Sequence, residues 1–178
     1  MRADAQRNRA LLVKAASAAI ARDGAYASLE EIARAAGVGS ATLHRHFPSR
    51  WALLEAVFHD RIEALCARAG ELAAEPDARE ALTTWLCELA VYSATTRGLV
   101  TSLLKAPQHS NSCSAMLVAA GEPLRRRAAD EGSVSPDVAM ADLVTLVNAV
   151  ALAVESASAT EAERLVRLAL RGISPPRR

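Results

Sequence analysis

The chain has few aromatic residues and almost no net charge. Phenylalanine, tryptophan and tyrosine make up 3% of its 178 residues, and the formal net charge is +1 at pH 7. Without an excess of basic residues, bulk charge gives no argument for nucleic-acid binding. The apolar content comes mainly from alanine, leucine and valine mixed with arginine and glutamate, and this composition favours helices.

Cysteine and long apolar runs are also scarce. Cys66, Cys87 and Cys113 lie far apart without a C-x-x-C pair, so their spacing indicates neither a disulfide framework nor a zinc site. No run of about eighteen uncharged apolar residues occurs, and the first residues lack the apolar segment of a signal peptide. We therefore expect a cytoplasmic protein with no membrane contact, no metal and no cofactor.

Apolar residues recur at helical spacing almost throughout, and no strand alternation or internal repeat is found. We predict an all-α fold of about nine helices, at 6–23, 28–36, 40–46, 50–74, 78–95, 98–105, 112–131, 136–156 and 161–172. Ser28 and Thr160 each precede a glutamate by three positions, which predicts a capping box at each residue. Residues 1–49 should form one unit and 50–178 a second, coupled by helix 50–74.

The stretch GVGSATLHRHFPSR, residues 37–50, combines features of several kinds of site. A phosphate loop is disfavoured because a capped helix, and not a strand, precedes the glycines. His44 and His46 are two positions apart and point to nearly opposite sides of a helix, so they do not make a metal pair. Ser40 lacks an orienting acid and a nucleophile turn, so no catalytic residue is predicted.

A capped helix, a glycine turn and a second short helix fit a helix-turn-helix. Its small core would consist of Ile32, Ala33, Val38, Leu43 and Phe47. The other side chains of the second helix are short or polar, and we predict that they read DNA bases: Ser40, Ala41, Thr42, His44 and Arg45. A plain helical hairpin inside a bundle would show the same pattern.

The segment SLEEIARAAGVGSATLHRHFPSRWALLEAVF resembles the DNA-binding signature of the TetR family of bacterial transcriptional regulators. That signature has a capped helix, an "IA..AGV" turn, a "TLYRHF"-like second helix and a "psK..L" helix start, in this order. The resemblance covers about residues 6–61. It implies a homodimer that binds a palindromic operator in double-stranded DNA, usually as a repressor released by a small ligand.

The resemblance also implies roles for single residues. It places Ser40, Ala41, Thr42 and Arg45 in the major groove or at its edge. It places Ser28, His44 and Arg50 at the DNA backbone, where the family most often has tyrosine in place of the histidine and lysine in place of the arginine. Because histidine adds a titratable ring, we expect phosphate binding at this position to strengthen at lower pH.

The C-terminal region resembles the family only in architecture. Its helix 136–156 contains LVTLVNAVALAVES, which is apolar nearly all round and so indicates cover on two sides. We expect a homodimer contact with helix 161–172 through Val144, Val147, Ala151, Val154, Leu165, Leu168 and Ala169. A central core helix of a single protomer would show the same pattern.

A pocket for an unknown small-molecule effector is expected among the fourth to eighth helices. Its candidate residues are Trp85, Leu89, Tyr92, Leu103, Met116 and Asn148, although large apolar side chains at helical spacing also suit a plain core. No convergent set of titratable residues indicates an enzyme. The alternatives to a DNA-binding regulator are a helical protein-interaction adaptor or an all-α enzyme that does not bind DNA.

Overall fold

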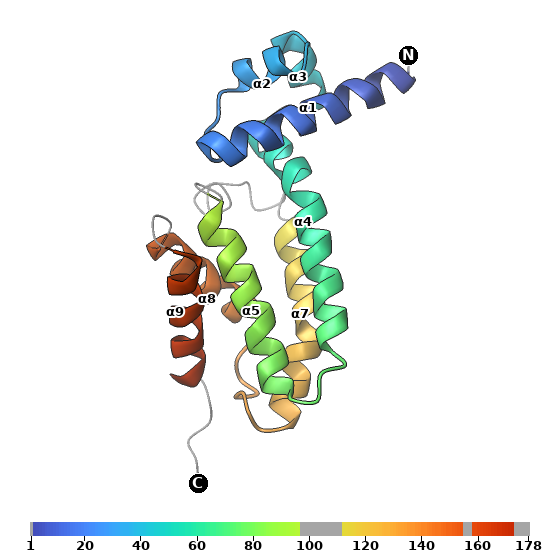
Figure 1. Ribbon diagram of the computed structural model, residues 1–178. Coiled ribbons are helices and arrows are strands. Elements are labelled where there is room, and N and C mark those ends of the chain that lie inside the picture. Colours follow the sequence, from blue (N-terminus) through green and yellow to red (C-terminus); the bar gives the residue numbers. More distant parts are fainter. Residues whose placement is uncertain (1, 97–111, 155–157, 173–178) are drawn as a thin grey trace. The chain divides into compact units, whose positions relative to one another are not determined.

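A computed structural model describes residues 2–96, 112–154 and 158–172 of the chain. These residues contain eight helices and no strand, which confirms the all-α prediction (Figure 1). The helix expected at 98–105, with the candidate residue Leu103, lies outside the described residues. None of the described helices combines the length and the apolar content that crossing a membrane requires.

The chain divides into two compact units, and the division falls inside α4 (Arg50–Leu72), between Asp60 and Arg61. The first unit holds α1 (Arg2–Asp23), α2 (Leu29–Ala35), α3 (Ser40–His46) and the start of α4. The second unit holds the rest of α4, with α5 (Ala78–Thr95), α7 (Ser112–Asp130), α8 (Met140–Ala153) and α9 (Ala159–Gly172).

The first unit is built on the inward stripe of α1. As the sequence predicted, Leu12, Ala16, Ala19 and Ile20 are buried. Gly24 ends this helix with a φ of 79°, a left-handed conformation that glycine adopts without steric cost. The helix α1 packs against α2, and α2 packs against α3. The buried apolar side chains from α2, from α3 with the residue that follows it, and from the start of α4 are Ile32, Ala33, Leu43, Phe47, Trp51, Leu53, Leu54 and Phe58.

The helix α5 lies at the centre of the second unit, in contact with α7, α8 and α9. It begins after Asp77, whose carboxylate accepts the backbone N–H of Glu80 at 2.9 Å. Trp85 of α5 is fully buried, and its indole N–H donates to the carbonyl oxygen of Leu65 in α4 at 2.8 Å. Gly121 of α7 leaves room beside the Trp85 ring and the end of the Met140 side chain.

Two helix starts differ from the sequence predictions. The helix α8 begins at Met140, four residues later than expected, where the Asp142 carboxylate accepts the backbone N–H of Ala139 at 3.1 Å. The helix α9 begins at Ala159, because the hydroxyl of Ser158 accepts the backbone N–H of Glu161 at 3.3 Å. The cap of α9 is therefore Ser158, and the prediction of Thr160 was wrong.

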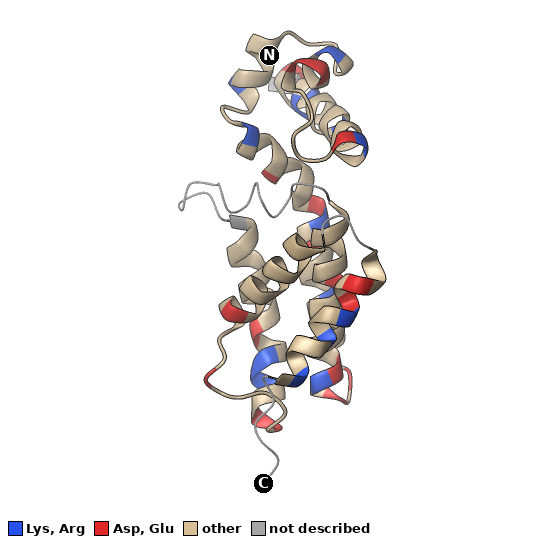
Figure 2. Ribbon diagram, turned by 90° about the vertical axis from the view of Figure 1, so that its left-hand side faces the viewer, with Lys and Arg blue, Asp and Glu red and all other residues tan. Residues whose placement is uncertain are grey.

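Residues of both charge signs are interspersed along the helices of the second unit (Figure 2). Within α7, Glu122 pairs with Arg125 at 2.8 Å and with Arg126 at 2.9 Å. Between α5 and α9, Glu80 pairs with Arg167 at 3.0 Å. The three consecutive arginines of α7 are thus largely neutralised, since Arg127 also pairs with Glu131 at 3.5 Å.

Candidate nucleic-acid interface

The helix α2 begins at the Ser28 cap that the sequence predicted. The Ser28 hydroxyl accepts the backbone N–H of Glu31 at 3.3 Å and donates to the carboxylate of Glu30 at 2.9 Å. Hydrogen bonds from the backbone N–H of Glu30 and from Ser28 hold the pKa of Glu30 below its usual value. A carboxylate therefore lies at the start of α2, beside the position at which the resemblance implies a DNA phosphate.

The turn after α2 directs the chain into α3 through a Schellman motif. The N–H of Val38 donates to the carbonyl oxygen of Ala33 at 3.0 Å, and the N–H of Gly37 donates to that of Arg34 at 3.1 Å. Gly37 has a φ of 71°, while a Cβ at this position would meet nothing within 4 Å. Backbone conformation, and not crowding, therefore explains the glycine.

The helix α3 presents one face to the core and one to solvent. Leu43 and, just after the helix, Phe47 are buried, and they hold α3 against the unit. Ser40, Ala41, His44 and Arg45 are exposed, and Thr42 is half-buried. The structure therefore places all five predicted base readers on a single seven-residue helix.

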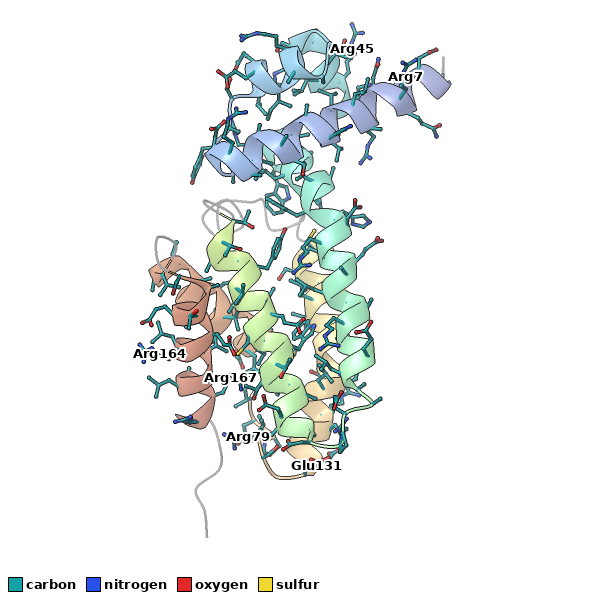
Figure 3. The ribbon with its side chains drawn as sticks, viewed as in Figure 1. Arg7, Arg45, Arg79, Glu131, Arg164 and Arg167 are labelled. Atoms are coloured by element: carbon teal, nitrogen blue, oxygen red, sulfur yellow. The ribbon has the colours of Figure 1, made fainter. Side chains whose placement is uncertain are left out.

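Arg45 carries the exposed positive charge of α3 (Figure 3). Within the described part of the chain, no ion pair or hydrogen bond is recorded for its guanidinium. Such a group is available to a base edge or a phosphate oxygen at no internal cost. His44 is also exposed, one position before Arg45.

Arg50 makes hydrogen bonds inside the first unit. Its side chain is half-buried, and its Nη1 donates to the carbonyl oxygens of Ala25 and Ala27, at 3.2 and 2.6 Å. These contacts join the first residue of α4 to the loop that leads into α2. Arg50 therefore has a structural role, and only its other guanidinium nitrogens are left for DNA.

Sequence reasoning missed Arg9, which lies on α1 and contacts the end of α3. Its guanidinium carbon is 5.4 Å from the centroid of the Phe47 ring, within the range of a cation–π contact. The two residues are 38 positions apart in the sequence, and no local motif links them. The contact becomes visible only when α1 is folded against α3.

The candidate ligand residues lie in the second unit, apart from Leu103, which falls outside the described residues. Trp85, Leu89 and Tyr92 share one face of α5, and the first two are buried. The guanidinium of Arg61 lies 5.6 Å from the centroid of the Tyr92 ring, and burial raises the pKa of Tyr92. Met116 of α7 and Asn148 of α8 are both half-buried.

The residues expected at a dimer contact fall into two groups. Val144, Val147, Ala151 and Val154 are packed inside their own protomer, so the prediction that they meet a partner chain is disfavoured. The other three lie on α9: Leu165 and Ala169 are half-buried, and Leu168 is 55% exposed. The helix α8, which is apolar nearly all round, packs on the core with one side and leaves Leu152, 41% exposed, outside that core.

No group of three or more histidine, cysteine, aspartate or glutamate side chains suited to a metal ion occurs among the residues that the structure describes. Among the three cysteines, Cys66 is half-buried and Cys87 and Cys113 are buried, all as free thiols. Burial raises the pKa of Cys87 to about 11, so this thiol is protonated at neutral pH.

A capped helix, a left-handed glycine and a second helix with an exposed polar face define a helix-turn-helix protein. Two family models match the chain: "Bacterial regulatory proteins, tetR family" over residues 12–57, and "Transcriptional regulator SbtR-like, C-terminal domain" over residues 77–175. The chain therefore belongs to the TetR family of bacterial transcriptional regulators, and its N-terminal unit is a DNA-binding domain. Members of this family are transcriptional regulators and not enzymes.

Solved structures agree with this assignment. A TetR transcriptional regulator from Streptomyces coelicolor is 30% identical, with a TM-score of 0.61 over 95% of this chain and 99% of that one. One from Mycobacterium vanbaalenii is 31% identical, with a TM-score of 0.55 over 98% and 99%. A search of curated proteins finds no match.

One similar fold was solved with DNA. A cysteine variant of the TetR family regulator CifR, complexed with a 26 bp double-strand operator DNA, is 19% identical, with a TM-score of 0.59. The match covers 92% of this chain and 95% of that one. At 19% identity, this match shows a similarity of fold alone.

Proposed function

We propose that this regulator is a repressor that binds a palindromic operator as a homodimer in the bacterial cytoplasm, and that a small ligand in the second unit releases it. The exposed face of α3 carries the DNA-binding part of the proposal, because the Arg45 guanidinium on it has no recorded partner among the described residues. Each protomer would insert α3 into the major groove of one half-site. The half-sites would lie a helical turn apart, or a multiple of it.

Within α3, Arg45 and Thr42 are the proposed base readers. A guanidinium suits the two acceptors on the guanine edge, and a threonine offers a hydroxyl and a methyl group. Ser40, Ala41 and His44 would lie at the groove edge and the backbone. Arg45→Ala should weaken operator binding by about 1 to 3 kcal/mol and relax selectivity at a single base position.

Selection of bound duplexes from random DNA, repeated at rising salt, tests this proposal. A palindrome should emerge, and its selectivity should survive salt concentrations that abolish non-specific binding. A helical adaptor would retain no duplex at any salt, and this outcome would reject the DNA-binding role. Transcription in vitro from a promoter that carries the selected palindrome then distinguishes repression from activation.

The homodimer would form through the outer faces of α8 and α9. Leu152 and Leu168 are large apolar side chains that stay exposed in the protomer, and Leu165, one helical turn from Leu168, is half-buried. Two copies of such a helix pair make a four-helix contact that removes these side chains from water.

Release would begin at the α5 face that carries Trp85, Leu89 and Tyr92. A ligand among these side chains lowers DNA affinity only if it binds better to a second form of the dimer. In that form, the distance between the two α3 helices would not match the distance between the half-sites. The protein should therefore bind its effector more weakly when it is saturated with operator, and calorimetric titration of the two forms measures this difference.

A further inference from the structure

Basic side chains gather at the C-terminal end of α3. The last turn of this helix contains His44, Arg45 and His46. Two other arginine side chains of the first unit have polar partners inside the protein: Arg22 pairs with Asp23 at 2.6 Å, and Arg50 donates to backbone carbonyl groups. For Arg45 no carboxylate partner is recorded in the described part of the chain, so the charge at this end of α3 is not neutralised internally.

The helix α1 brings a further guanidinium to the same place. Arg9 lies over the ring of Phe47, with 5.4 Å between the guanidinium carbon and the ring centroid. Phe47 directly follows α3 and is only 2% exposed, so it offers a fixed surface. Arg9 itself is exposed, and within the described residues no ion pair of its guanidinium is recorded.

The contact with Phe47 restrains Arg9 but uses none of its hydrogen-bond donors. A ring beneath a guanidinium interacts with its flat face and leaves the N–H groups, which point outward in the guanidinium plane, for other acceptors. Because the side chain is already held, less rotamer freedom is lost when an acceptor binds. Figure 3 shows that Arg7 of α1 and Arg45 of α3 also lie at this end of the unit.

We propose that Arg9 binds a phosphate of the operator backbone beside the C-terminal end of α3, so that the DNA interface extends from the helix-turn-helix onto α1. This inference rests on the proposed operator binding. A guanidinium held at the flank of a reading helix faces the strand backbone that borders the groove. Phosphate oxygens accept two parallel N–H bonds from such a group.

The salt dependence of operator binding tests this proposal. Full-length protein is titrated onto a labelled duplex that the wild type has selected, at several salt concentrations, and the variants are Arg9→Gln, Arg9→Lys and Lys14→Gln. Each phosphate contact contributes about 0.9 to the slope of log affinity against log salt. For a dimer, Arg9→Gln should therefore reduce the slope by about 2 and weaken binding to all duplexes alike.

The other two variants are controls. Arg9→Lys keeps the charge and should keep most of the slope, although it loses the paired hydrogen bonds. Lys14→Gln removes an exposed charge from a different face of α1 and should leave the slope unchanged. The melting temperature of each variant shows whether the fold is retained, which is expected because Arg9 is exposed.

Two results would contradict the inference, and they are distinguishable. If the wild type binds its selected duplex and Arg9→Gln has the same salt slope as the wild type, the phosphate contact alone is overturned. A wild type that selects no duplex at any salt overturns the proposed operator binding and this contact with it.

Discussion

The guanidinium of Arg50 joins two segments of the DNA-binding unit, because its Nη1 donates to Ala25 and Ala27 in the loop before α2. A hydrogen bond from a charged group to a half-buried carbonyl stabilises a fold by about 1.5 to 3 kcal/mol. Arg50→Ala should therefore lower the free energy of unfolding of this unit by about 1.5 to 3 kcal/mol. Urea unfolding followed by circular dichroism measures this loss in the absence of DNA.

Arg34→Ala is the matched control for Arg50→Ala. Arg34 is exposed on α2, and no side-chain partner is recorded for it within the described residues. Its removal should change the free energy of unfolding by less than about 0.5 kcal/mol. If both variants unfold at the same urea concentration as the wild type, Arg50 does not stabilise the loop.

Glu122 predicts a dependence of stability on pH. Hydrogen bonds from Arg125 and Arg126 lower the pKa of Glu122 to about 2, below its usual value of 4.5. A carboxyl group whose pKa is lower in the folded state stabilises the fold above its unfolded pKa, and the contribution is lost as the pH falls through the folded pKa. Stability of the second unit should therefore fall between about pH 5 and pH 2.

Glu122→Gln isolates this contribution. The variant should be about 1 to 2 kcal/mol less stable at pH 7, and its stability should depend less on pH in the acid range. Thermal unfolding from pH 7 down to pH 2.5 measures both effects. Equal acid sensitivity in the variant and the wild type would show that other groups control the acid response.

At the scale of helices, Gly121 sets how closely α7 approaches α5 and α8. A Cβ at this position would lie 2.7 Å from the Trp85 ring and 2.7 Å from the Met140 methyl group. Alanine favours a helix by about 1 kcal/mol over glycine, but overpacking a core costs about 1 to 3 kcal/mol. The rigid indole cannot move aside easily, so Gly121→Ala should lower the melting temperature.

Gly70→Ala on α4 should raise stability, in contrast to Gly121→Ala. This glycine is exposed, and a Cβ there would meet nothing within 4 Å. Only the helix propensity changes, so the variant should gain up to about 1 kcal/mol in free energy of unfolding. Calorimetry on both variants compares the two effects directly, and a stabilised Gly121→Ala would show that the second unit is loosely packed.

The sequence predicted the helices well because its signals are local. Capping residues, glycine turns and apolar spacing act within a few positions, and α3 and α5 have the predicted boundaries. Competing local signals caused the errors: Ser158 and Thr160 both precede a glutamate by three residues, and the structure uses the first as the cap. The face of α8 that packs on the core was unpredictable for a similar reason, since apolar residues occupy nearly its whole circumference.

Some features of the candidate site follow from local sequence signals, and others depend on helix packing. The exposed residues of α3 follow from helical spacing, and the sequence identifies them without a structure. The Arg9 contact with Phe47 and the Arg50 contacts with Ala25 and Ala27 join residues far apart in the chain. Such contacts depend on how helices pack, which no local pattern encodes.

At the scale of the whole molecule, the proposed dimer must use side chains that the protomer leaves exposed. Val144, Val147, Ala151 and Val154 are already buried and would gain nothing from a partner chain. Leu152 and Leu168, at 41% and 55% exposed, are among the large apolar side chains that the described protomer exposes most. In the proposed dimer, a second copy on the α8 and α9 side would cover them.

Leu168→Glu should therefore separate the dimer and leave the protomer folded. A carboxylate that is buried without a partner at an interface costs about 3 to 5 kcal/mol, whereas at an exposed position of a monomer it costs little. Light scattering at micromolar concentration should give the protomer mass for this variant and twice that mass for the wild type. Leu11→Glu, which changes a 40% exposed leucine of α1, should remain dimeric. A dimeric Leu168→Glu would move the contact to another face, and a monomeric wild type would reject the dimer itself.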